Sequence, residues 1–248
     1  IERKAVPKYL FEELERQKEF NFNAQTVTVP NRLAYDVERW GKWVLEEARK
    51  EIGQFYPPDP DGSIPVAYLW ARTVECPNPG CRAEIPLVRQ LWLANRNNKK
   101  VALRIAPDKK ANRVQFKVVE GKAVDFDPKQ GTMRLGNVLC PICKQSAKGA
   151  YLKECGKRGL IGQRIMAVVV NPKQGQKRYR TDLESDAIGF AKASSFLQRL
   201  KQRNANRDID PVPNEPISRD WPRTILVPLY GIENWGQLYN DRQALVLV

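Results

Sequence analysis

Histidine is absent from this chain of 248 residues. Catalytic triads and dyads that use imidazole as a general base are therefore excluded, and a metal site must be completed by other ligands. No glycine-rich loop of the kind that holds phosphates or dinucleotides is present either. We therefore assign no catalytic and no cofactor-binding residue, and we expect that this chain alone performs no chemistry.

Long apolar segments are equally scarce. Ile165–Val170 is far shorter than the roughly 20 residues that a membrane-spanning helix requires, and no basic start followed by an apolar core resembles a signal peptide. With five cysteines and no export signal, disulfide bonds are not expected. These absences predict a soluble, cytoplasmic protein with no membrane partner.

The two ends of the chain carry a further expectation. The sequence begins at Ile1 and finishes on the apolar run 244–248. Because free termini are usually polar, we expect this chain to be part of a longer polypeptide. A complete small protein with a docked C-terminal strand is the alternative.

The net charge of +14 is concentrated in the middle of the chain. Residues 81–180 contain 23 basic and 6 acidic side chains, whereas residues 1–80 and 181–248 carry net charges of −2 and −1. A concentrated basic block indicates a polyanionic partner or an acidic neighbouring domain. Nucleic acid is the partner that we favour.

Hydrophobic patterning predicts an α+β protein in three regions. Residues 1–63 form an N-terminal helical segment, in which an apolar stripe from Leu33 to Ile52 predicts an amphipathic helix between an Asn31 cap and Gly53. Residues 64–180 form a basic, β-rich module. Residues 181–248 comprise a helix with a capping box at Thr181 and Glu184, a proline-rich loop, and a last helix capped by Asn240 or Asp241.

The β-rich module contains short segments rich in β-branched and aromatic residues, several of which are separated by turn-forming residues. The predicted strands are Val66–Val74, Leu87–Leu93, Val101–Ile105, Val114–Val119, Met133–Leu139 and Arg164–Val170.

Four cysteines in this module have the spacing of a structural zinc site. Cys76 and Cys81 form a C-x4-C turn, and Cys140 and Cys143 form a C-x2-C turn. Each turn can supply two thiolates to a tetrahedral Zn²⁺ ion, and four thiolates leave no open coordination position for catalysis. A redox pair or an iron–sulfur cluster fits this spacing less well. The fifth cysteine, Cys155, is expected to be a small side chain, buried or partly buried, without chemistry.

Basic residues follow the second cysteine pair at intervals that suit contacts with phosphates. A solvated basic face or a dock within the molecule is the plain alternative for any single one of them. The predicted nucleic-acid-binding residues are Lys144, Lys148, Lys153, Lys157, Arg158, Arg164, Lys177, Arg178 and Arg180.

Several segments together carry a family resemblance. The strongest likeness is in Val66–Val74, Cys76-Pro-Asn-Pro-Gly-Cys81 and Ala83–Leu87. Supporting segments are Asp36–Gly41, Lys100–Arg104, Cys140–Cys143, Tyr230–Gly236 and Arg242-Gln243. In these segments the chain resembles the zinc-ribbon-containing adenine-specific DNA methylases of bacteria and archaea, some of which occur in anti-phage defence systems.

This resemblance implies a parent enzyme that transfers a methyl group from S-adenosylmethionine to adenine N6 in DNA. The cofactor-binding glycine motif and the Asn/Asp-Pro-Pro-Tyr motif of that family are missing, so this chain is not expected to bind S-adenosylmethionine alone. The chain would be a DNA-binding section inserted in a Rossmann-like α/β methyltransferase, with the remaining methyltransferase domain as its partner. The alternative is a non-enzymatic zinc-ribbon adaptor that binds nucleic acid or protein.

Overall fold

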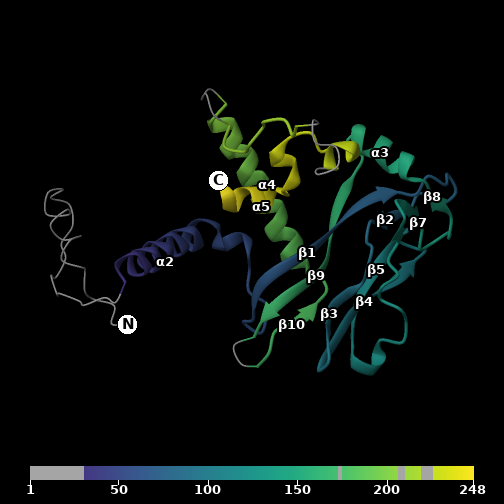
Figure 1. Cartoon of the computed structure of the whole chain (residues 1–248), viewed down its shortest axis with the longest axis horizontal. Coiled ribbons are helices and arrows are strands. Elements are labelled where there is room, and N and C mark those ends of the chain that lie inside the picture. The colour runs from purple at the N-terminus through teal and green to yellow at the C-terminus, as the bar shows by residue number, and fades with distance from the viewer. Residues whose placement is uncertain (1–30, 173–174, 206–209, 219–225) are drawn as a thin grey trace, which may run out of the picture. The chain divides into compact units, whose positions relative to one another are not determined.

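The structure is a computed structural model that describes residues 31–172, 175–205, 210–218 and 226–248. Contacts between residues divide the chain into two compact units, Ile1–Glu51 and Ile52–Val248. The described residues combine helices with a seven-stranded and a three-stranded sheet, so the predicted α+β class is confirmed (Figure 1). None of the described helices is long and apolar enough to cross a membrane.

The predicted N-terminal helix is α2, Arg32–Ile52. Its first turn is capped by Asn31, whose Oδ1 accepts a hydrogen bond from the Ala34 N–H at 2.9 Å. The helix ends before Gly53, where the short 3₁₀ helix η1, Gly53–Phe55, begins. Both predicted ends of this helix are therefore confirmed.

The large sheet is antiparallel except where β2 meets β5 through the single pair Glu84 and Arg113. Figure 1 shows β1 and β9 as two long neighbouring strands. The strand order is β10-β9-β1-β2-β5-β4-β3. The strands are β1 Ile64–Glu75, β2 Glu84–Pro86, β3 Trp92–Arg96, β4 Lys99–Asp108, β5 Arg113–Glu120, β9 Gly162–Asn171 and β10 Arg178–Arg180.

Alternation of apolar and polar side chains explains why the longer strands form. In β5, Val114 and Phe116 are buried while Gln115 and Lys117 are exposed, so one face of the strand contributes to a core with Leu103 of β4. Four predicted strands lie within β1, β4, β5 and β9, and those predictions are confirmed. The 3₁₀ turn η2, Gly121–Ala123, follows β5.

The predicted strand Leu87–Leu93 is wrong, because most of this segment crosses between β2 and β3 without pairing in the sheet. Its buried backbone is satisfied by a different segment of the chain. Thr132 Oγ1 accepts from the Val88 N–H at 3.1 Å, and the Val88 carbonyl accepts from the Met133 N–H at 2.9 Å. Such a crossover has the same apolar pattern as a buried strand.

The small sheet is made of β6 Met133–Arg134, β7 Asn137–Leu139 and β8 Ser146–Ala147. The single strand predicted over Met133–Leu139 is therefore a hairpin. Leu135 and Gly136 both have positive φ, at 50° and 79°, as a two-residue hairpin turn requires. The helix α3, Gly149–Lys157, follows this sheet and was not predicted.

The C-terminal elements are α4 Glu184–Arg203, η3 Val227–Tyr230, η4 Trp235–Leu238 and α5 Asp241–Leu247. The two helices, α4 and α5, pack together on Phe55. Ala193 and Leu197 of α4 meet Ala244 and Leu245 of α5 around the Phe55 ring. The predicted Asn240 cap is confirmed by its Oδ1, which accepts from the Gln243 N–H at 3.0 Å.

The start of α4 differs from the predicted capping box at Thr181 and Glu184. Leu183 occupies the cap position, and its N–H donates to Asp186 at 2.8 Å. Asp186 is fully buried and also accepts from Arg180, which in turn forms a two-pronged contact with Asp59. This buried ionic cluster, Asp59, Arg180 and Asp186, ties the loop before β1 to β10 and α4.

We predict that Asp186→Asn destabilises the protein by about 3 kcal/mol, because it breaks a buried ion pair of Arg180. Burial by itself raises the pKa of Asp186. The hydrogen bonds from Arg180 and from the Leu183 N–H, together with the positive charge of Arg180, have the larger effect and hold the pKa below the ordinary aspartate value. Its contribution is therefore present above the ordinary pKa and is lost as pH falls through the lowered one.

Urea unfolding of both proteins at neutral pH and in acid would check this prediction. Asp61→Asn is the matched control, because Asp61 contacts Arg178 at an exposed site and its loss should have a much smaller effect. Equal unfolding midpoints for Asp186→Asn and the parent at neutral pH would contradict it.

Candidate metal centre

The first cysteine pair lies in the turn of the β1–β2 hairpin. The last paired residues are Glu75 and Glu84, so residues 76–83 form the tip. The Cys76 N–H donates to the Ala83 carbonyl at 2.8 Å, and the Asn78 carbonyl accepts from the N–H of Cys81 at 2.8 Å. Arg82, directly after the second cysteine, has a φ of 48°. The turn is closed by hydrogen bonds of its own backbone.

The second pair lies in the equivalent place between β7 and β8. The Cys140 N–H donates to the Gln145 carbonyl at 2.9 Å, and the Lys144 N–H donates to the Cys140 carbonyl at 3.0 Å. Lys144 again follows a cysteine directly and has a φ of 63°. Both cysteine pairs therefore occupy tight turns at hairpin tips, each followed by a left-handed residue.

The structure brings all four predicted cysteines together, with their Sγ atoms within 4.8 Å of one another. The Sγ of Cys76 is 3.7 Å from that of Cys143, and the Sγ of Cys81 is 3.8 Å from that of Cys140. A tetrahedron of sulfurs about 2.3 Å from a central ion has edges of about 3.8 Å. The sulfur positions therefore fit a four-coordinate metal ion that bridges the two hairpins.

Backbone N–H groups surround the sulfurs and stabilise their anionic forms. Burial raises the pKa of the Cys76 thiol to about 12, partly offset by a hydrogen bond from the Asn78 backbone. A hydrogen bond from the Gln145 backbone lowers the pKa of Cys143 to about 7. Because a metal binds the thiolate form, binding must release the protons that the buried thiols otherwise hold.

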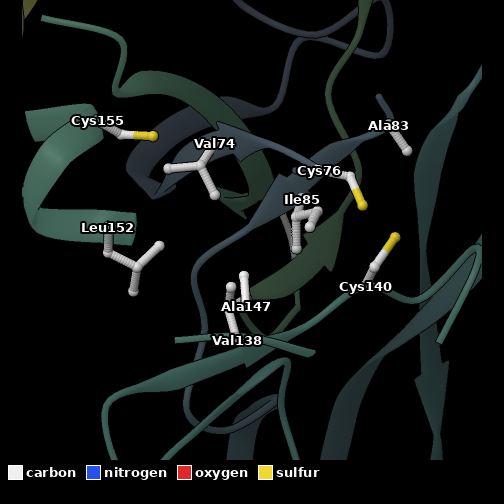
Figure 2. Packing of buried hydrophobic residues seen from close by; sticks show 9 residues of the cluster. All are labelled: Val74, Cys76, Ala83, Ile85, Val138, Cys140, Ala147, Leu152 and Cys155. Carbon is white, nitrogen blue, oxygen red and sulfur yellow. The ribbon is translucent and has the colours of Figure 1, made fainter. Parts of the chain in front are cut away.

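The metal centre is part of a hydrophobic cluster that joins both sheets to α3. Figure 2 shows Val74 and Ile85 of the first hairpin, Val138 and Ala147 of the second, and Leu152 of α3 around Cys76 and Cys140. The sulfurs of Cys76 and Cys140 point toward a common point. Cys76 and Cys140 are almost fully buried, so the centre is shielded from water on its inner side.

Cys155 lies in the same cluster but outside the four-sulfur group, on α3. Its side chain is buried. The expectation of a buried fifth cysteine is confirmed.

Of the predicted nucleic-acid-binding residues, five gather on the second cysteine turn and α3. Lys144, Lys148, Lys153, Lys157 and Arg158 are all exposed. Within the described part of the chain, none of the five forms an ion pair. They place free positive charge beside the metal centre. Lys177, also predicted, is exposed at the start of β10.

The other three predicted residues are engaged by partners inside the protein. Arg164 of β9 donates to the Val114 carbonyl at 2.6 Å and lies over the Phe116 ring. Arg178 pairs with Asp61, and Arg180 belongs to the buried ionic cluster. Asp61 and Asp59 are 117 and 121 residues earlier in the chain than the arginines they bind. Asp186 is only six residues after Arg180, so it is the one partner here that is close in sequence.

Comparisons of the chain with models of protein families, with curated proteins and with solved structures found no match. The class of the site therefore rests on its geometry: a four-cysteine cluster that could hold a metal ion between two hairpins. The likeness to adenine-specific DNA methylases stays a prediction from the sequence.

We predict that the purified chain binds one divalent metal ion and that Cys81→Ser weakens binding. Loss of a ligand should weaken metal affinity by more than the roughly 10- to 100-fold caused by loss of a residue that hydrogen-bonds to a ligand. Titration with Co²⁺, whose visible absorption reports tetrahedral thiolate ligation, measures both stoichiometry and affinity. Cys155→Ser is the matched control and should titrate like the parent. Equal weakening by the two substitutions would contradict the assignment of the four ligands.

Proposed function

We propose that the chain is a zinc-ribbon module in which Zn²⁺ is structural and the adjoining basic face binds nucleic acid. Two hairpins with a cysteine turn at each tip are the arrangement of a zinc ribbon. Four cysteines satisfy a tetrahedral ion completely, which leaves no position for a substrate or a water. Zinc is favoured over other metals because four thiolates in a tetrahedron suit it and no redox chemistry is indicated.

The observation that carries the nucleic-acid proposal is the set of five exposed, unpaired cations on residues 144–158. Glu154 is the one acidic residue in this segment. Lys153 and Lys157 are four residues apart on α3, so their side chains lie on the same face of the helix. Lysine side chains placed in this way can bind phosphates and position a nucleic acid without reading its sequence.

The resemblance to zinc-ribbon adenine methylases makes DNA the favoured nucleic acid and a SAM-dependent N6-adenine methyltransferase the favoured parent enzyme. In that setting the module would be an insertion in a Rossmann-like domain and would hold DNA while the catalytic domain extracts an adenine from the helix. A non-enzymatic adaptor is the competing proposal. Binding of S-adenosylmethionine by this chain is expected under neither, and clear micromolar binding in calorimetry would show that the cofactor-binding part is not missing from this chain.

We predict that this chain binds duplex DNA with strong salt dependence and that the quadruple change K144E/K148E/K153E/K157E weakens binding. If each lysine neutralises one phosphate, loss of the four should reduce the slope of log K against log salt by about 3 to 4. Fluorescence anisotropy with a labelled duplex over a series of salt concentrations gives the slope.

The matched control changes the charge by the same amount on the β4–β5 side of the module. Lys109, Lys110, Lys117 and Lys122 are all exposed there, and K109E/K110E/K117E/K122E should leave most of the slope intact. If both quadruple variants reduce the slope of log K against log salt by the same amount, the basic face around α3 is not the binding surface and the net charge alone accounts for binding.

A further inference from the structure

A cavity of about 570 Å³ lies beside the metal-centred cluster in the second unit. Its walls come from β1, the segment after β2, β6, α3 and the C-terminal η3 and η4 turns. This volume is within the range of roughly 300–1,000 Å³ that small-molecule sites occupy. Leu152 of α3 belongs both to the wall of the cavity and to the cluster around the cysteines.

One wall of the cavity is fixed by a close contact between backbones. Gly156 of α3 lies against the backbone of Tyr230, and Gly231 lies against the backbone of Gly156, with no room for a Cβ atom at either glycine. Gly231 also has a φ of 80°, in the left-handed region that favours glycine. The position of η3 over α3 is thus set by main-chain packing, so this wall of the cavity is preformed.

Apart from the hydroxyl of Tyr230, the side chains that line the cavity are apolar except for two. Leu87, Met133, Ile161, Val227 and Ile232 supply much of the apolar lining. Of the two polar residues, Gln237 uses its side-chain oxygen to cap η4 through the N–H groups of Glu233 and Asn234.

The other polar residue is Arg72 of β1, which is half-buried. Its Nη2 donates to the Gln237 carbonyl at 3.2 Å, and among the described residues its guanidinium has no carboxylate partner. A guanidinium offers five N–H donors in a planar fork that matches a carboxylate. Arg72 therefore retains donors beside an apolar cavity.

We propose that this cavity binds a small molecule with an apolar body and one carboxylate, which pairs with Arg72. The apolar walls favour the body of such a ligand, and the unpaired guanidinium selects its anionic end over a neutral one. This site is separate from the basic face and does not depend on nucleic-acid binding.

Isothermal titration of the full chain with decanoate and with decanol tests the proposal. The parent should bind decanoate about tenfold or more tightly than decanol, as a charge-assisted hydrogen bond implies. Arg72→Met should remove this preference and keep decanol binding, and Val227→Trp should fill the cavity and abolish binding of both.

Arg89→Met is the matched control, because Arg89 is exposed and does not line the cavity. Retained metal stoichiometry in each variant shows that the module is folded. The proposal is overturned if the parent binds neither compound, if Val227→Trp binds decanoate like the parent, or if Arg72→Met keeps the preference for the anion.

Discussion

The four-sulfur centre is the constraint on which the second unit depends. β1 and β2 pair over three residues, and β7 and β8 pair over two, so each hairpin is short and its tip is held mainly by the cysteine turn. The two tips are separated by 58 residues of sequence. Bringing them together reduces chain entropy. A metal ion held by the four cysteines, as we propose, would offset that loss, because its binding free energy becomes folding free energy.

A second constraint is which of the basic side chains of residues 81–180 are paired within the protein. The count of 23 basic side chains overstates the positive surface, because Arg164, Arg178 and Arg180 are satisfied by groups inside the protein. What remains near the four cysteines is the set on residues 144–158, where no ion pair forms among the described residues. The pairing of the charges, more than their number, determines which part of this surface can attract a polyanion.

Features with local causes could be predicted from the sequence. The cysteine turns, the Asn31 and Asn240 caps and the strands around Val114–Val119 and Arg164–Val170 each follow from neighbouring residues. The crossover 87–91 could not be predicted from the sequence, because its backbone is bound by Thr132, 44 residues away. Likewise, one of the two carboxylates that bind Arg180 belongs to Asp59, which lies beside it in space but 121 residues away in sequence.

The helix α3 connects the cysteine cluster, the cavity and the exposed lysines. Leu152 and Gly156 lie on its buried side and line the cavity, and Leu152 also packs in the cysteine cluster. Lys153 and Lys157 of the same helix are exposed. It has only nine residues, two of them glycine, and is too short for a clear helical repeat of apolar residues, which explains why patterning did not reveal it. Because its buried side rests on the cluster that contains Cys76 and Cys140, a change that displaces these cysteines also displaces the helix that carries the cavity wall and the two lysines. The cysteine cluster is therefore the packing support that both proposed binding surfaces share.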